Sequence, residues 1–540
     1  MRNGIALLCM GLAATWVAAT ASGGQPARKR RGPYKRTHIQ GMKLLDAGEH
    51  AKALTFFQDY LAAQPDDLEA HFGLAAAQAG TGDAEAALAT VRKAVEAGLP
   101  LGRFVAGPRG WLKPLTDTKE FRDLVREKRL ALVHGPMPGA VTSRSARFWI
   151  RTATASPVKV VLGRGKPGTE IESAPQWTSQ ETDFTAVLEV TGLSPATRYF
   201  YDVVVDGKST LAPRHPSFRT FPSPNSRARF RVGFGGGAGY VPQRERMWTT
   251  IRGFKPLAFL FLGDNVYIDL PKMPEMQRYC YYRRQSRPEY RDFVAATPIY
   301  AVWDDHDFGT NDCIPGPEID DPPWKVPVWK VFCQNWVNPY YGGGDKAPGC
   351  WFHFTIGDVD FFMTDSRFYR SNPRKPNPSM LGPAQKQWLL DRLKESRATF
   401  KVLANGVPWA TGTKPGSLDT WDGFKDERKE IFDFIEQNKI PGVILLSADR
   451  HRSDVWKLKR SVGYPLYEFE TSRLTNQHVH APMEGALFSY NKKQAFGLLT
   501  FDTRKDDPEV TYRIFTIDGE EVHSITLRRS QLTPRGVPRR

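Results

Sequence analysis

Two apolar runs that each end in a group of acidic residues constrain the fold of this chain more than any other feature. The first run, 258–262, is followed by the sequence GDNVY at 263–267. The second, 299–303, runs into DDHD at 304–307 and reaches Asn311. Short apolar runs are typical of buried strands, and the carboxyl ends of central strands in α/β proteins face one crevice. We therefore expect both acidic groups to contribute to one site.

A third apolar run also leads to residues of metal-binding type. Residues 443–446 form the run, and the sequence SADRH follows at 447–451. If that segment stays extended, its period of two directs Asp449 and His451 to the same side. Carboxylates, an amide, an imidazole and a phenol suit hard or borderline cations, whereas clustered carboxylates without a cation repel one another. The three strand ends together predict a metal site.

The first part of the chain contains an internal repeat. The 540 residues exceed one ordinary core, so roughly three to four domains are expected. Within 38–130, GEHAKAL at 48–54 recurs as GDAEAAL at 82–88, about one tetratricopeptide period later. This predicts a helical segment with one or two tetratricopeptide-like repeats, which often bind a protein partner. Because fewer than three repeats make a poor concave surface, a helical spacer that packs on a neighbouring domain is equally favoured.

Two later segments differ in hydrophobic period. Residues 131–222 alternate with a period of two, and GLSPATRYFY at 192–201 resembles the strand entry of fibronectin type III domains. We therefore expect an Ig/fibronectin-like β-sandwich there. From 228 to 520, strand patterns alternate with helical ones, which is typical of an α/β domain. The sandwich segment holds no cluster of chemically active residues, so the site belongs to the α/β segment.

The two ends of the chain carry targeting and charge signals. Residues 1–21 have the pattern of a cleaved secretory signal peptide, 22–37 form a basic linker, and 521–540 form a basic C-terminal tail. Much of the net charge of +17 lies in these solvated ends, so we expect no specific nucleic-acid recognition. No other stretch approaches the length of a transmembrane span. We expect an exported protein of the periplasm, the cell envelope or the extracellular space.

Four cysteines remain after the signal peptide, at 280, 313, 333 and 350. None has the paired C-x-x-C spacing of a structural zinc site. In an oxidising compartment, one or two disulfides are compatible with this number, and the spacing does not select a pairing.

The motifs of the α/β segment resemble those of a known enzyme family. They occur in the order GDxxY at 263–267, WDDHD at 303–307, DxRxxR at 365–370, LGxxQxxWL at 381–389 and DxH at 449–451. Over residues 230 to about 476 the chain resembles the PhoD-like alkaline phosphatases of the calcineurin-like metallophosphoesterase superfamily. The resemblance implies a double-sheet sandwich with flanking helices, export, and hydrolysis of phosphate esters. It also implies a dinuclear or multinuclear metal site with ferric iron and calcium.

The resemblance assigns metal ligands by position. They are Asp264, Tyr267, Asn311, Asp449 and His451, to which we add Asp305 from the same acidic group. A carboxylate at 264 would bridge two ions, and the phenolate oxygen at 267 is a hard donor matched to ferric iron.

Phosphoester hydrolysis also requires groups that act on the substrate. It needs a metal-activated hydroxide, neutralisation of the phosphate oxygens and help for the leaving oxygen. Arg367, Arg450 and Arg473 are candidates for binding the phosphate, with a surface ion pair as the alternative for each. His306 is the candidate for hydrogen bonding to the substrate or leaving group, with a packed core histidine as the alternative.

The chain departs from the family pattern at two places. It has Gly235-Gly236 where the family has a Ser-Cys pair whose thiolate binds iron, and Ala448 where the family has glycine. Without the thiolate, we expect the site to select iron less strongly and to accept other divalent metals. The leading prediction is an exported, metal-dependent phosphomonoesterase or phosphodiesterase. The alternative is a non-catalytic envelope binding protein with a degenerate metal site.

Overall fold

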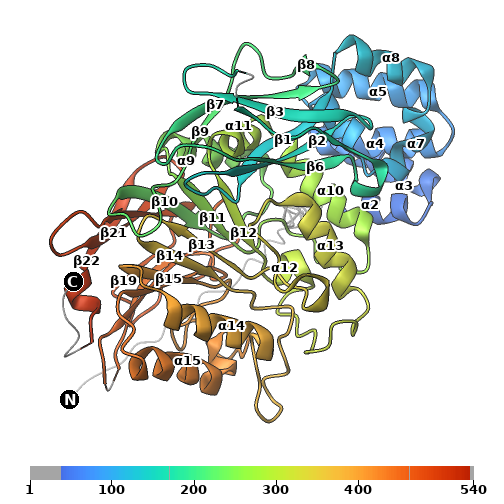
Figure 1. The fold of residues 1–540 in the computed structure, drawn as a ribbon. Helices are drawn as coiled ribbons and strands as arrows, with labels where there is room; N and C mark the ends of the chain where they lie inside the picture. Colours follow the sequence, from blue (N-terminus) through green and yellow to red (C-terminus); the bar gives the residue numbers. More distant parts are fainter. Residues whose placement is uncertain (1–37, 169–170, 461, 535–540) are drawn as a thin grey trace, which may run out of the picture. The chain divides into compact units, whose positions relative to one another are not determined.

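The computed structural model describes residues 38–168, 171–460 and 462–534 (Figure 1). The chain divides into two compact units, Met1–Gly32 and Pro33–Arg540, and every described residue lies in the second. The predicted signal peptide at 1–21 and basic linker at 22–37 lie outside the described residues. No helix of the described part combines the length and the hydrophobicity needed to cross a lipid bilayer.

The segment 38–130 is helical, as its repeated sequence predicts. Its helices are α2 (Ile39–Asp46), α3 (His50–Ala63), α4 (Leu68–Gly80), α5 (Ala84–Glu96), α6 (Leu101–Ala106), α7 (Arg109–Thr116) and α8 (Lys119–Glu127). The carboxylates of Asp67 and Asp83 cap α4 and α5 by accepting hydrogen bonds from backbone N–H groups of the first turn. Phe72 of α4 packs with its ring centre 5.9 Å from that of Tyr279 in α10 (Pro274–Gln285). The helical segment thus packs directly on the domain that contains α10.

The largest sheet joins strands from distant parts of the chain. Its nine strands run in the order β22-β21-β20-β10-β11-β12-β1-β2-β6. Their bounds are β1 (Leu132–Gly139), β2 (Ala146–Thr152), β6 (Thr185–Val190), β10 (Arg229–Gly235), β11 (Ala258–Leu262), β12 (Ile299–Val302), β20 (Ala495–Asp502), β21 (Glu509–Thr516) and β22 (Glu521–Arg528). The three central strands β10, β11 and β12 are parallel, so their carboxyl ends meet at one edge.

A second sheet of seven strands runs in the order β13-β14-β15-β16-β18-β17-β19. Their bounds are β13 (Phe352–Ile356), β14 (Val359–Met363), β15 (Phe400–Ala404), β16 (Val443–Ser447), β17 (Ser453–Leu458), β18 (Leu466–Thr471) and β19 (Phe488–Tyr490). β13 and β14 form an antiparallel hairpin about Gly357, and β14, β15, β16 and β18 are parallel. The carboxyl ends of these four parallel strands, including that of β16, therefore lie at the same edge of the sheet.

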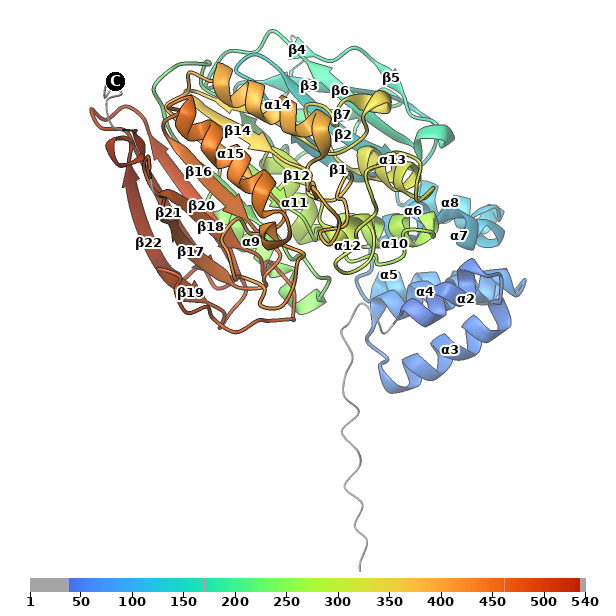
Figure 2. The same ribbon diagram turned by 90° about the horizontal axis from the view of Figure 1, so that it is seen from below.

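The two sheets face each other through aromatic side chains. Phe501 of β20 lies 5.9 Å from Phe361 of β14, and Tyr512 of β21 lies 4.3 Å from Phe469 of β18, between ring centres. Helices α9 (Arg246–Gly253) and α11 (Pro288–Ala296) pack on the nine-stranded sheet. Helices α14 (Gly382–Glu395) and α15 (Lys425–Gln437) lie beside the seven-stranded sheet, near β14 and β15 in Figure 1 and near β14 and β16 in Figure 2. The expected mixed α/β domain is confirmed.

The segment 131–222 divides its strands between two sheets. β1 pairs in parallel with β12 through Gly139 and Ile299, so β1, β2 and β6 extend the nine-stranded sheet. The six remaining strands form a separate sheet: β3 (Pro157–Gly163), β4 (Ile171–Glu172), β5 (Gln176–Trp177), β7 (Arg198–Val205), β8 (Lys208–Ser209) and β9 (Ser217–Arg219). The predicted Ig/fibronectin-like sandwich is therefore not confirmed as an independent unit, because hydrogen bonds merge one of its layers with the α/β domain.

The chain end at 521–540, predicted as a basic tail, is structured over its first part. Residues 521–528 form β22, which pairs antiparallel with β21, and a short 3₁₀ helix follows at Arg529–Leu532. Leu527 and Leu532 are buried, whereas Arg528 is exposed. The tail prediction is wrong here because the basic residues mask the apolar positions that hold the strand in place. Of the cysteines whose disulfide pairing the sequence leaves open, Cys313, Cys333 and Cys350 form no disulfide in the described part of the chain.

Candidate active site

Tyr267 connects strand ends that belong to the two sheets. Its hydroxyl donates a hydrogen bond of 2.7 Å to the carboxylate of Asp264, which follows β11. The same oxygen lies 3.5 Å from Nε2 of His451, which follows β16. It also accepts a hydrogen bond of 2.5 Å from Nδ2 of Asn476. The first and third strand ends of the sequence analysis therefore meet.

The second strand end joins through Asp304, which follows β12. Its Oδ1 atom pairs with Nε of Arg367, a residue that follows β14 in the other sheet. Its backbone N–H donates to Asp307 at 3.0 Å, and Asp307 also accepts from the backbone N–H of Val266 at 2.8 Å. The side chain at 307 thus ties the loop after β12 to the loop after β11.

The backbone at these strand ends adopts left-handed conformations. φ is +52° at Asp264, +72° at Asp449 and +47° at His451. Such conformations cost a non-glycine residue of order 1–3 kcal/mol and are concentrated at functional sites. The prediction that 449–451 continues as an extended strand is wrong: β16 ends at Ser447, and the N–H of Arg450 turns back to the carbonyl of Ala448 at 3.0 Å. A turn, rather than a strand period, positions the two candidate ligands.

Acidic groups are concentrated where the loops meet. One ligand atom each from Asp264, Asp305 and His306 lies within 4.8 Å of the others. Burial raises the pKa of Asp264 well above its ordinary value, and the neighbouring carboxylate at 305 raises it further. Burial also opposes ionisation of Asp305, but Arg367 and His306 hold its pKa at about 2. The cluster therefore brings poorly solvated carboxyl groups within 4.8 Å of each other.

The donor atoms of the cluster fit metal cations. At these strand ends, four buried polar atoms have no hydrogen-bond partner among the described residues: Oδ1 of Asp264, Oδ1 of Asn265, Oδ2 of Asp304 and Nδ1 of His451. Leaving such an atom unpaired costs about 1–3 kcal/mol. Carboxylate and amide oxygens together with an imidazole nitrogen are the ligands that hard and borderline cations take.

His306 is held as a cation at the edge of the cluster. Its Nδ1 atom pairs with the carboxylate of Asp269, and its ring centre lies 4.5 Å from that of Tyr267. Burial lowers the pKa of His306, but the carboxylates of Asp305, Asp264 and Asp269 outweigh that effect and raise it to about 10. With 13% of its side chain exposed, the ring is neither a sealed core residue nor a surface one. It is placed to donate a proton or a hydrogen bond.

Arg367, predicted to bind phosphate, lies behind the carboxylates. Its side chain has no exposed surface. Nη1 and Nη2 donate to the two carboxylate oxygens of Asp419 at 2.6 and 3.2 Å, while Nε pairs with Asp304. Because these carboxylates occupy the donor directions of the guanidinium, it orients acidic groups instead of facing solvent.

The other two arginines differ in their distance from the cluster. Nη1 of Arg450 lies 3.3 Å from the carboxylate of Asp449, and its Nε donates to the carbonyl of Thr413 at 3.3 Å. Arg473 instead donates to the carbonyl of Asn491 at 2.7 Å, in the segment before β20. Within the described structure, Arg450 contacts a candidate ligand and does not have all its N–H groups paired with carboxylates. Arg367 is paired with carboxylates on every side, and Arg473 contacts no candidate ligand.

Asn311 is a candidate ligand that the structure leaves apart from the cluster. It is exposed in the turn after α12 (Asp305–Phe308), and its side chain makes no hydrogen bond to the cluster within the described residues. The neighbouring Asp312 does join it, since its backbone N–H donates to Asp305 at 2.6 Å. The turn therefore contacts the cluster through the backbone N–H of Asp312 and not through the side chain of Asn311.

Two histidines that were not among the predicted site residues, His478 and His480, lie beside His451. The ring centres of His478 and His480 lie 5.2 and 5.7 Å from that of His451, and 4.6 Å from each other. The sequence His478-Val479-His480 could have indicated these site residues, because imidazoles suit borderline metals and phosphate. Lys414, which donates to Asp312 at 2.6 Å, was also missed, and a lone lysine in a loop carries no such signal.

Three family models and one curated protein match parts of this chain. A family described as PhoD-like phosphatase matches residues 233–513, which is just over half of the chain. A domain of unknown function (DUF7800) matches 129–223, and a tetratricopeptide repeat matches 44–99. Alkaline phosphatase D of Bacillus subtilis is 28% identical over 187 residues, which cover 29% of this chain and 32% of that protein. The match thus spans about a third of the length of that relative.

Two solved structures share the fold. The structure of PhoD aligns with a TM-score of 0.62 at 19% identity, covering 75% of this chain and 91% of that one. The purple acid phosphatase PPD1 from seeds of yellow lupin (Lupinus luteus) aligns with a TM-score of 0.52 at 12% identity, covering 74% of this chain and 75% of that one. Identities this low establish a likeness of fold alone.

Proposed function

Since the chain belongs to the PhoD-like phosphatase family, we propose that it is an exported, metal-dependent hydrolase of phosphate esters. The observation that carries the proposal is the contact of Tyr267 with Asp264 on one side and His451 on the other. This contact joins two sheets at a buried acidic cluster whose unpartnered oxygens fit cations.

We propose that the cations are held by the residues that the resemblance implies. These are Asp264, Tyr267, Asp449 and His451, together with Asp305 of the same acidic group, whereas Asn311 lies apart on an exposed turn. Bound cations would supply an acidic water as the nucleophile and positive charge for the phosphate oxygens. Iron and calcium are the expected metals, and the absence of a thiolate at Gly236 extends the expectation to other divalent ions.

His306 has the geometry to assist the leaving oxygen. Asp269 fixes the orientation of the ring through Nδ1, which leaves Nε2 to donate toward a substrate. Arg450 is the proposed phosphate-binding group, because its guanidinium adjoins Asp449 at the edge of the cluster. Arg367 acts as a positioning residue that holds Asp304 and Asp419, and Arg473 has no contact that assigns it to the substrate within the described structure.

The tetratricopeptide-like helices have a structural role in this proposal. Arg103 of α6 lies with its guanidinium carbon 4.9 Å from the ring centre of Tyr279, and Trp111 of α7 packs 6.1 Å from the same ring. These contacts turn one side of the helical segment toward α10, and any protein partner would bind its exposed residues, such as those of α3. Hydrolysis of a phosphate ester distinguishes this proposal from the alternative of a non-catalytic binding protein with a degenerate metal site.

Hydrolysis of a chromogenic phosphate monoester and diester, with and without a chelator, tests the proposal. We expect hydrolysis by the wild-type protein to stop in chelator and to return when metal is added back. Asp449→Asn should lose activity, whereas Asp345→Asn, which changes an exposed aspartate of the same kind, should retain it. Chelator-resistant hydrolysis, or equal activity of the two variants, would contradict a metal site at this place.

A further inference from the structure

A groove rich in basic residues lies at the end of the central strands opposite the candidate active site. It has a volume of about 1350 Å³ and is lined by the segment before β10, the start of β7, the end of β9 and the end of α9. The acidic cluster follows the carboxyl ends of β11 and β12, whereas the groove adjoins Leu257 and Pro298, just before these strands begin. Five residues of extended chain span about 17 Å, so the two sites are separate.

The lining of the groove is basic and contains no acidic residue. Arg229, Arg252 and Arg513 have carboxylate partners outside the groove, at 3.7, 4.0 and 3.5 Å. Such exposed pairs contribute little, about 0–1 kcal/mol each. Five further basic residues of the lining have no carboxylate partner in the described structure: Arg198, Arg219, Arg227, Arg231 and Lys255. A concentrated positive potential of this kind attracts anions.

Two backbone arrangements concentrate the charge. The sequence Arg227-Ala228-Arg229-Phe230-Arg231 alternates exposed arginines with buried apolar residues, so three guanidinium groups project from one face at intervals of about 7 Å. Arg198 and Arg219 are direct partners across the antiparallel pair of β7 and β9. Like charges in that relationship destabilise a sheet unless a counter-charge separates them.

The chemistry of the lining selects one class of anion. Guanidinium groups bind phosphate oxygens in a bidentate manner. The groove exceeds the range of about 300–1000 Å³ that is typical for a small ligand. Its two aromatic residues, Phe218 and Phe230, are 3% and 6% exposed, so no ring is available to stack on a nucleic-acid base. Phosphate groups repeated along an extended chain can pair with the guanidinium groups, occupy a groove of this length and bind without an aromatic ring.

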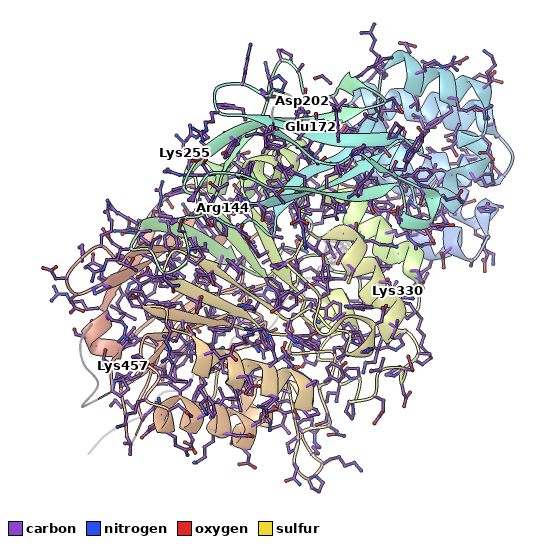
Figure 3. The ribbon with its side chains drawn as sticks, viewed as in Figure 1. Arg144, Glu172, Asp202, Lys255, Lys330 and Lys457 are labelled. Carbon is purple, nitrogen blue, oxygen red and sulfur yellow. The ribbon has the colours of Figure 1, made fainter. Side chains whose placement is uncertain are left out.

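We propose that this groove is a second anion site, which binds a linear polymer of phosphate groups through the phosphates alone. Binding in the groove involves none of the residues of the candidate active site. Figure 3 places Lys255 beside the strands that line the groove, and Lys330 and Lys457 in other parts of the molecule. Lys330 and Lys457 can therefore serve as control positions, since they carry the same charge as a basic residue of the groove but lie outside it.

Binding of a fluorescently labelled long-chain inorganic polyphosphate to the full-length protein, in chelator, tests the proposal. The groove variant is Arg198→Gln/Arg227→Gln/Arg231→Gln, and the control is Lys330→Gln/Lys457→Gln/Lys459→Gln, which loses the same charge at exposed positions elsewhere. We expect the groove variant to lose at least tenfold in affinity and to show a weaker salt dependence, because fewer counterions are released on binding. The control should stay within twofold of the wild type.

Equal losses in the two variants would show attraction by net charge alone and would overturn the proposal. Tighter binding of a single-stranded DNA of equal charge, sensitive to the groove variant, would identify a nucleic acid as the occupant and would also overturn it. A thermal unfolding temperature equal to that of the wild type would show that the groove variant is folded. Because binding is measured without metal, failure of the hydrolase proposal would leave this result unaffected.

Discussion

A Cβ atom added to Gly236 would lie 2.6 Å from the Cβ atom of Ala448. The same atom would lie 3.0 Å from the carbonyl oxygen of Gly263, which precedes the candidate ligand Asp264. The two places where this chain departs from the family pattern are therefore neighbours in space. The methyl group at 448 fills the room that a cysteine side chain at 236 would need.

This proximity changes the expected outcome of restoring the thiolate. Gly236→Cys alone should destabilise the protein by about 1–3 kcal/mol, since it overpacks a closed site. Gly236→Cys/Ala448→Gly should recover most of that loss and shift metal preference toward iron. Thermal unfolding and metal content after identical reconstitution with iron, zinc, manganese and calcium provide the measurement. Additive effects of the two substitutions would show that the positions are independent.

Arg103 and Glu69 form a buried ion pair that joins α6 to α4. Nε and Nη2 of Arg103 donate to Glu69 at 3.1 Å, and neither side chain is more than 3% exposed. We expect Arg103→Met to lower the free energy of unfolding by about 3–5 kcal/mol, because it leaves a buried carboxylate without its partner. Glu69→Gln/Arg103→Met should lose less than the single variant. Urea unfolding measures both, and a larger loss in the double variant would contradict the pairing.

Lys401 predicts a pH dependence of stability. The residue is 2% exposed in β15, and burial lowers the pKa of its ammonium group from 10.5 to about 7, with Arg529 adding to the effect. Between these values the unfolded chain holds the proton and the folded chain does not, so the free energy of unfolding rises with pH. Lys401→Met should therefore be more stable than the wild type at pH 7, and the difference should shrink toward pH 10. A difference that is constant across this range, in urea unfolding, would contradict the assignment.

Tyr267 predicts an optical signature. If its phenolate binds ferric iron, the iron-loaded protein should absorb visible light by charge transfer from the ligand to the metal. Tyr267→Phe should remove the band, whereas Tyr340→Phe, which alters a tyrosine hydrogen-bonded to His353, should keep it. An iron-loaded wild-type protein without the band, or a variant at 267 that retains it, would show that the phenol is not a ligand.

Local patterns of the sequence were sufficient to predict most elements of the α/β domain. The apolar runs at 258–262 and 443–446 form β11 and β16, and the repeated sequence at 48–54 and 82–88 contributes to α3 and α5. In each case a hydrophobic period or a capping residue within a few positions determines the element. The meeting of the strand ends was also predictable, because parallel strands present their carboxyl ends to one edge.

Long-range pairing and unusual backbone angles were not predictable from these patterns. Nothing in the period of 131–222 indicates that β1 pairs with β12 and merges two sheets, since pairing depends on contacts between distant segments. The left-handed backbone at Asp449 and His451 cannot be predicted from the residue types, because aspartate and histidine adopt it only where surrounding contacts stabilise it. The same limit explains why Asn311 was predicted in the cluster and lies on an exposed turn instead.

Metal content and thermal unfolding of Asp264→Asn test the central claim most directly, which is that strand ends of both sheets hold the same metal centre. Burial and the carboxylate of Asp305 disfavour the charge at 264 when no cation is bound. We therefore predict that Asp264→Asn in chelator unfolds at or above the temperature of the wild type, while added metal stabilises only the wild type. Elemental analysis should find the metal greatly reduced in Asp264→Asn and in Asp449→Asn. Wild-type metal content in either variant would contradict the claim.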